Sequence, residues 1–199
     1  APASADGVLA DRARLLAEVE AEAAEASRQA GAYARSAELF KNCLARATTS
    51  DARAEIHVGL GRVYQEQGDS QGAIVQLETA LRLFGKHPPR NLAELGLQAA
   101  GQVLLHLVFS VFPGLAGKRI HDPALQNRAD TLFASIRIYY FVDVAKVVWA
   151  GVTTINLSRR FSRDQDVALA YSFFGVLLFG MGMLTRAGRY CEEALDLAR

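Results

Sequence analysis

The sequence predicts an all-α protein in which antiparallel helix pairs stack into a right-handed solenoid of about nine helices. Two observations indicate this fold class. Along most of the 199 residues, apolar side chains recur at steps of three and four, the spacing of one face of a helix. Glycine, proline or short polar clusters interrupt these stretches at intervals that suit short helices and tight turns.

The first predicted helix pair occupies residues 8 to 47. Residues 8–30 are dominated by Ala, Glu and Arg, which are strong helix formers, and carry only a weak apolar stripe. Gly31 breaks the helix, and a second helix is expected over residues 33–47. The polar run 48–51 offers several helix caps and serves as a connector. Compared with the pair that follows, this is a degenerate repeat.

The clearest pair lies at residues 52 to 84. Gly68 can adopt the left-handed conformation that ends a helix, and Asp69 or Ser70 can cap the next one. Small and large residues stand here at the offsets of the tetratricopeptide repeat, which this stretch resembles: Leu60, Gly61, Tyr64, Gly68, Ala73, Leu77 and Ala80. His57 stands where that pattern prefers Trp. The resemblance implies a helical hairpin with closely packed helices, and an ordinary hairpin without repeat ancestry is the alternative.

A different kind of helix is predicted over residues 90 to 112. Its polar residues recur every four positions and form a narrow seam beside a wide apolar face: Glu94, Gln98, Gln102, His106 and Ser110. The stretch is long enough to cross a bilayer, but five polar residues in a line argue against lipid on all sides. We expect a buried or partly covered helix, with a partner-facing or dimer-facing surface and membrane contact as alternatives. His106 is expected to be a hydrogen-bonded packing residue and not a metal ligand.

Pro113 and Gly114 are expected to end this helix. The following run, from Gly114 to Arg119, resembles a phosphate-binding loop only superficially. Such a loop needs an earlier Gly at the right distance, Ser or Thr after the Lys, and a preceding strand. We therefore expect Lys118 and Arg119 to belong to a solvated connector.

Two further helix pairs are predicted, at residues 123–160 and 165–199. Asp122 is a suitable cap for the first, with Pro123 in its first turn. In its second helix three residues correspond to Ala73, Leu77 and Ala80 of the clearest pair: Ala145, Trp149 and Val152. Residues 167–184 predict another long apolar helix, and a final repeat of the form Gly-x-Tyr begins at Gly188.

Residues 72 to 199 also resemble the C-terminal repeat region of large bacterial signalling proteins. The motifs that carry this resemblance are Leu104–His106, Phe112–Pro113, Ile138–Phe141, Ala145–Ala150, Ile155–Arg159, Ala168–Tyr171 and Gly188–Tyr190. In those proteins a class III adenylate or guanylate cyclase domain, or a protein kinase domain, is joined to an AAA-type ATPase and a helical-repeat tail. The resemblance implies that this chain is a regulatory tail excised from a longer protein. It carries neither the metal-binding aspartates of a cyclase nor the phosphate loop of an ATPase.

The composition agrees with a non-catalytic role. A net charge of +1 shows no basic excess, so nucleic acid is not an expected partner. Cys43 and Cys191 stand alone in predicted helices, without a disulfide framework or metal-ligand spacing, which favours a reducing, cytoplasmic setting. The four histidines are spread over different elements, and no Ser lies in a nucleophile elbow. We expect no cofactor, no metal and no enzymatic activity in this chain.

Function must then be argued from shape. In a solenoid of helix pairs, the first helix of each pair lines a concave surface that binds peptides or partner domains. The residues predicted to face this groove are Glu55, Arg62, Gln65, Glu66, Asn127, Asp130 and Arg137. Arg62 and Arg137 are suited to bidentate contacts with carboxylates, although any of these residues can equally be a solubilising surface charge.

The sequence therefore predicts a protein-protein interaction and regulatory module of a multidomain signalling ATPase or nucleotide cyclase. Its partner would be a protein or peptide, including other domains of the same chain. The alternative is a self-association or membrane-contacting scaffold that acts through the uncharged helices at residues 95–117 and 167–184.

Overall fold

The computed structural model describes residues 16, 19–116, 122–160 and 164–199. The chain groups into two compact units, Ala1–Lys86 and His87–Arg199. All regular structure in the described residues is helical, which confirms the predicted all-α class. The sequence predicts one helical-repeat domain over residues 1–199, and this expectation stays a prediction.

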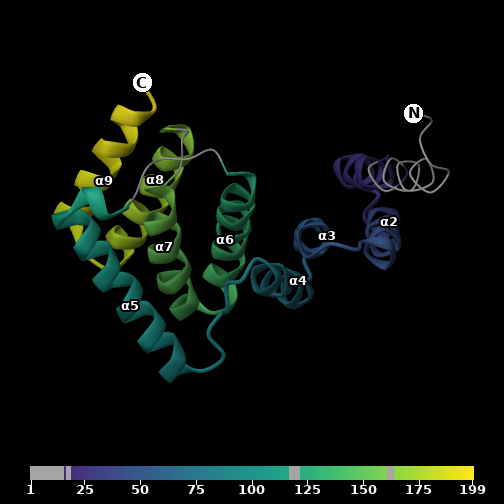
Figure 1. Ribbon diagram of the computed structural model, residues 1–199, viewed down its shortest axis with the longest axis horizontal. Coiled ribbons are helices and arrows are strands. Elements are labelled where there is room, and N and C mark those ends of the chain that lie inside the picture. Colours follow the sequence, from purple (N-terminus) through teal and green to yellow (C-terminus); the bar gives the residue numbers. More distant parts are fainter. Residues whose placement is uncertain (1–15, 17–18, 117–121, 161–163) are drawn as a thin grey trace, which may run out of the picture. The chain divides into compact units, whose positions relative to one another are not determined.

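The first unit contains a helix through residues 19–29, followed by α2 (Tyr33–Arg46), α3 (Ser50–Glu66) and α4 (Ser70–Leu83) (Figure 1). Helix α3 packs against α2 on one side and against α4 on the other. The turns fall where the sequence predicts them, because Gly31 and Gly68 adopt the left-handed conformation with φ of 76° and 82°. The side chain of Asp69 caps α4 by accepting the Gly72 N–H at 2.8 Å.

Close helix packing in this unit depends on Gly61. A Cβ added to Gly61 would lie 2.8 Å from Cγ of Leu77 and 3.4 Å from the carbonyl oxygen of Ala73, both on α4. Only a glycine therefore lets α3 and α4 approach this closely. A hydrogen bond joins the helix through residues 19–29 to α2, because the hydroxyl of Ser36 donates to the carbonyl of Ala24 at 2.7 Å.

The second unit begins with α5 (Leu92–Val111) and a short 3₁₀ helix, η1 (Pro113–Ala116). Four helices follow: α6 (Pro123–Val142), α7 (Val144–Ser158), α8 (Asp164–Gly180) and α9 (Leu184–Leu197). Consecutive members of these four pack against each other, whereas α5 packs against α7 (Figure 1). Part of the core lies between α7, α8 and α9, and consists of Val152, Ile155, Phe174, Leu178 and Ala187.

The α8–α9 pair repeats the geometry of α3–α4. Gly175, Gly182, Ala187, Cys191 and Ala194 follow one another at the spacing of Gly61, Gly68, Ala73, Leu77 and Ala80. Gly182 has a φ of 76°, and a Cβ on Gly175 would lie 2.7 Å from the Cys191 sulfur and 3.3 Å from the Ala187 carbonyl oxygen. The predicted helix over 167–184 is therefore too long, because the left-handed Gly182 ends it and lets the Met183 N–H bond the Leu178 carbonyl.

The α6–α7 pair is built differently. One residue, Asp143, separates the two helices and caps α7 by accepting the Lys146 N–H at 3.3 Å. Trp149 and Val152 are buried as predicted, but Ala145 is exposed. Its assignment to the position of the buried Ala73 is wrong, because Ala145 lies two residues after the cap Asp143, whereas Ala73 lies four residues after the cap Asp69 and so faces a different side of its helix.

The predicted connector residues Lys118 and Arg119 lie outside the described part of the chain, as do residues 161–163, before α8.

Candidate interaction surface on helix α5

Helix α5 turns its polar seam toward the rest of the second unit. The side-chain amide of Asn156 on α7 donates to the backbone carbonyl of Gln102 at 2.8 Å and to its side-chain oxygen at 3.0 Å. Arg159, the residue directly after α7, donates to the Phe109 carbonyl at 3.0 Å and to the Ser110 hydroxyl at 3.1 Å. Because these two residues supply hydrogen-bond partners, the polar groups of Gln102 and Ser110 are satisfied within the protein.

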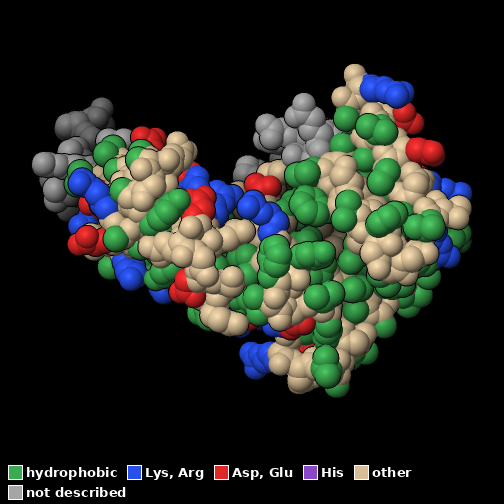
Figure 2. Space-filling view, turned by 180° about the vertical axis from the view of Figure 1, so that it is seen from behind, with side chains coloured by type: hydrophobic (Ala, Val, Ile, Leu, Met, Phe, Trp, Pro, Cys, Tyr) green, Lys and Arg blue, Asp and Glu red, His purple; other side chains and the backbone are tan. Residues whose placement is uncertain are grey.

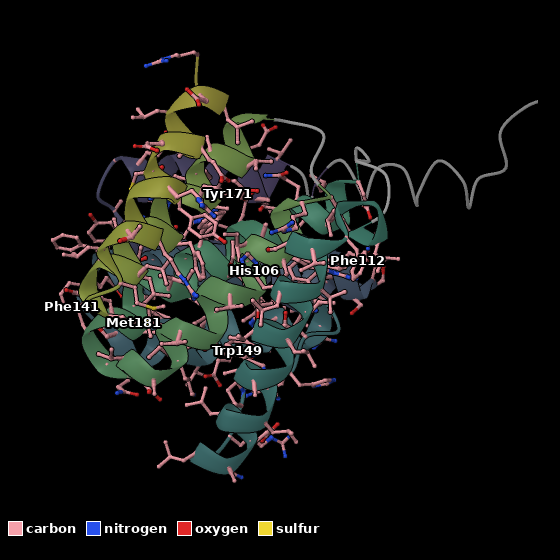
Figure 3. All side chains as sticks on the ribbon, turned by 90° about the vertical axis from the view of Figure 1, so that its left-hand side faces the viewer. His106, Phe112, Phe141, Trp149, Tyr171 and Met181 are labelled. Atoms are coloured by element: carbon pink, nitrogen blue, oxygen red, sulfur yellow. The ribbon has the colours of Figure 1, made fainter. Side chains whose placement is uncertain are left out.

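His106, the fourth of the five seam residues, is buried (Figure 3). Its Nδ1 lies 3.2 Å from Oδ1 of Asn156, and its Nε2 bonds the hydroxyl of Tyr190 on α9. Asn156 uses its amide nitrogen toward Gln102, so its oxygen accepts, and Nδ1 of His106 must carry the proton. Nε2 then accepts from the Tyr190 hydroxyl. The expectation that His106 is a hydrogen-bonded packing residue is confirmed.

The surroundings of His106 keep its imidazole neutral. Its pKa is lowered below the ordinary value of 6.5, chiefly by burial and further by the positive charge of Arg159, while the bond to Asn156 opposes the shift. The ring also packs against Phe174, with the centroids 5.6 Å apart, and Phe174 meets Tyr190 edge to face. Burial raises the pKa of Tyr190, so its hydroxyl keeps the proton that it donates.

The opposite side of α5 is apolar and exposed. Leu97, Leu104 and Val111 expose 77%, 63% and 67% of their surface, and they follow one another along one side of the helix. Further exposed apolar residues of this helix and its C-terminal end are Leu92, Val103, Leu105, Leu107, Phe112 and Leu115. Of the two states expected, buried or partly covered, the structure shows the partly covered one, because the apolar face is exposed. The polar seam occupies the side that α7 and α9 cover, which leaves the apolar side outward.

Helix α8, the other uncharged helix singled out in the sequence, behaves differently. Val167, Ala170 and Phe174 on one side of α8 are buried, and Phe174 and Leu178 form part of the core with α7 and α9. Val176 and Phe179 on the other side are exposed. Of these two largely apolar helices, α5 therefore presents the larger unpartnered apolar face.

Length and composition also set α5 apart. With 20 residues and a mean hydropathy of 1.4, it is the one helix among the described residues that is long and apolar enough to cross a membrane. Only 6% of the apolar stretch within this helix is buried. Length and hydropathy alone do not distinguish a membrane contact from a protein contact, since both need an uncharged face.

Other apolar side chains are exposed on the second unit. Hydrophobic side chains are numerous on the face of this unit that Figure 2 shows. Phe141, which is 82% exposed, lies at the outside of the unit next to the α6–α7 turn (Figure 3). Tyr140, its neighbour in the sequence, is also exposed. These residues stand at a turn and lack the continuous helical stripe that α5 presents.

The predicted groove residues fall into two sets. Glu55 and Arg62 are exposed on α3 of the first unit, where Gln65 is half-buried. Glu66, on the same helix, forms an ion pair with Arg28. Arg28 also pairs with Glu25 at 2.5 Å, and this hydrogen bond is the main cause that lowers the pKa of Glu25, with a smaller contribution from Arg62. Arg28, which the sequence did not indicate, thus pairs with the charge of Glu66, one of the predicted groove residues.

The remaining predicted groove residues lie on α6 of the second unit. Arg137 is exposed, while Asn127 and Asp130 are half-buried, and the amide of Gln126 donates to Asp130 at 3.4 Å. Each set belongs to its own unit, and their role in partner binding stays a prediction.

Among the described residues, no three His, Cys, Asp or Glu side chains come close enough together to hold a metal ion. Both cysteines are free, with Cys43 buried and Cys191 exposed. No protein-family model matches the chain, and no curated protein matches it.

Proposed function

We propose that this chain is a non-catalytic protein-interaction module and that the apolar face of α5 is its principal docking surface. The observation that carries the proposal is the inverted polarity of α5. Its polar seam is satisfied by Asn156, Arg159 and Tyr190, whereas Leu97 and Leu104 face solvent. An exposed, continuous apolar stripe on an otherwise well-packed unit is typical of a surface that a partner covers.

The arrangement also explains why α5 keeps this orientation. Turning α5 to bury its leucines would remove Gln102 and His106 from their hydrogen-bond partners on α7 and α9. The buried polar contacts therefore fix which face is offered to a partner. A module of this kind would suit the regulatory tail of a signalling ATPase or nucleotide cyclase, the class of protein that the sequence resembles.

A tetratricopeptide-like solenoid is part of this proposal. Its support is the recurrence of one hairpin geometry in α3–α4 and α8–α9, with a left-handed glycine at each turn and a glycine at each close contact. In such a solenoid the exposed Arg62 of α3 would form part of a peptide groove. The groove is a second binding surface, separate from α5.

The proposal can be tested by photo-cross-linking in cells. A benzophenone amino acid replaces Leu97 on the α5 face, and Val75 of α4, which is 58% exposed, serves as the matched control position. We expect irradiation to give protein adducts from position 97 and none from position 75. Adducts to lipid alone from position 97 would instead support the membrane-contact alternative, and the absence of any adduct would contradict the docking role of α5.

The non-catalytic part of the proposal has its own assay. The purified chain should neither hydrolyse nor cyclise ATP or GTP in the presence of magnesium or manganese. Turnover that co-purifies with the chain and persists after a second chromatographic step would contradict it.

A further inference from the structure

We infer that the occupant of the α5 face is the α5 helix of a second copy of this chain, packed antiparallel about a two-fold axis near the middle of the helix. This inference rests on the proposed docking role of α5. It is carried by the spacing, the sizes and the lack of charge of the side chains on that face.

The spacing is that of a helix-pairing seam. Six exposed positions alternate at steps of four and three along α5: Ala93, Leu97, Ala100, Leu104, Leu107 and Val111. This alternation keeps one stripe facing a partner helix along the whole length of a coiled pair. A lipid surface makes no such demand on spacing.

The sizes of these side chains favour an antiparallel partner. The small residues, Ala93 and Ala100, lie in the N-terminal half, and large residues occupy the C-terminal half. In an antiparallel pair Ala100 packs against the partner's Leu104, and Ala93 against the partner's Val111. Leu97 then packs against the partner's Leu107. A parallel pair would stack Ala on Ala and leave gaps, which close-packed interfaces avoid.

The N-terminal half of α5 also permits the close approach that this pairing needs. Gly96 and Gly101 are exposed, and nothing lies within 4 Å of a Cβ placed on either. In the antiparallel arrangement these open positions receive the larger side chains of the partner's C-terminal half. An antiparallel pair also sets the helix dipoles in opposite directions, which is electrostatically favourable.

The absence of charge narrows the choice of partner. No Asp, Glu, Lys or Arg occurs from Leu95 to Gly117, so this face offers no counter-charge to an ordinary amphipathic helix. A helix of the same length whose facing side is also uncharged meets this requirement, and α5 has such a side, because its one charged residue, Glu94, lies in the polar seam. A two-fold pair uses the same patch on both copies, as isologous dimers do.

The size of the face predicts a weak dimer. A helix of 20 residues is about 30 Å long and about 10 Å wide, so the α5 stripe covers about 300 Å² on each copy. Stable interfaces usually bury about 800 Å² per partner. We therefore expect a monomer-dimer equilibrium in the micromolar range, tunable by the concentration of the chain.

Cysteine cross-linking of the full chain tests the inferred geometry. Single Leu97→Cys and Leu107→Cys variants are made in a Cys191→Ser background, because Cys191 is the exposed native thiol and Cys43 is buried. In the antiparallel pair, position 97 lies beside position 107 of the partner, while two copies of position 97 are offset by about 15 Å along the axis. We expect oxidation to cross-link the mixture of the two variants and neither variant alone.

Light scattering provides the second readout. The wild-type mass should rise toward that of a dimer between about 1 μM and about 300 μM. Leu104→Arg, which buries an unpaired charge in the pair, should raise the dissociation constant by about 100-fold or more. Because Leu104 is exposed, this variant should keep the native Trp149 fluorescence, which shows that it folds.

Three outcomes would overturn the inference. These are a wild-type monomer at every concentration, cross-linking of each single variant with itself, and a dimer that Leu104→Arg leaves intact. If the chain is monomeric but position 97 still photo-cross-links to another protein, the docking role of α5 stands and self-pairing fails. If position 97 gives no adduct either, both fail.

Discussion

Asn156 joins α7 to the seam of α5, and its removal should destabilise the second unit by a predictable amount. Asn156→Leu keeps a similar volume but leaves the buried Nδ1–H of His106 without an acceptor. An orphaned buried donor costs about 1–3 kcal/mol, and the half-buried Gln102 groups, which water can reach, add less than about 1 kcal/mol. We therefore expect a loss of about 2–3 kcal/mol in the free energy of unfolding.

Urea denaturation followed by tryptophan fluorescence measures the loss of stability in the second unit. Trp149 is the only tryptophan and is buried on α7, so its emission reports on the second unit. With a urea dependence of about 1–3 kcal/mol/M, the midpoint should fall by about 0.7–3 M. The control is Val176→Thr, an exposed substitution on α8 that should stay within about 0.5 kcal/mol of the wild type.

A double variant makes the test sharper. In His106→Leu/Asn156→Leu the donor and its acceptor are both absent, so the double variant should be more stable than the sum of the single losses predicts, by about 1–2 kcal/mol. A change within about 0.5 kcal/mol for Asn156→Leu, or additive losses in the double variant, would refute the reasoning that the seam depends on this bond.

Three further expectations concern His106 and the turns. Because burial lowers the folded-state pKa of His106 below 6.5, the unfolded chain takes up the proton first as the pH falls. Stability should be full above about pH 6.5 and decline below it, and His106→Gln should flatten this slope in urea titrations at several pH values. Gly182→Ala should cost about 1 kcal/mol because of the positive φ, whereas Gly188→Ala, within α9 and with open space around it, should gain up to about 1 kcal/mol in thermal unfolding. Asp69→Ala should remove the α4 cap and cost about 0.5–2 kcal/mol, which circular dichroism can measure.

The features that the sequence predicts well are those set by neighbouring residues. Gly31 and Gly68 mark turns because only glycine adopts a positive φ without strain, and Asp69 caps because it directly precedes α4. The prediction that residues 90–112 form a helix with one polar and one apolar side also rests on local sequence, since it follows from the spacing of the polar residues. These rules act within a few residues and are visible in any sequence window.

The orientation of α5 depends on residues far along the chain. Periodicity shows that this helix has a polar and an apolar side, but burial is decided by Asn156, Arg159 and Tyr190, which lie in α7 and α9. One signal was present, because the side-chain amide of an asparagine within the largely apolar α7 needs a polar partner when it is buried. The position of Gly182 as a turn was missed for a related reason, since the run of apolar residues on both sides masks it.

The orientation of α5 can be measured directly by the reactivity of single thiols. Leu104→Cys and Leu95→Cys, each in the Cys191→Ser background, place a thiol on the outward and inward sides of the same helix, where the native residues expose 63% and 9% of their surface. At concentrations of about 1 μM, below the expected dimerisation range, we predict that maleimide labels position 104 at least about 10-fold faster than position 95, which requires local opening. Equal rates, or faster labelling at position 95, would contradict the outward apolar face on which both proposals depend.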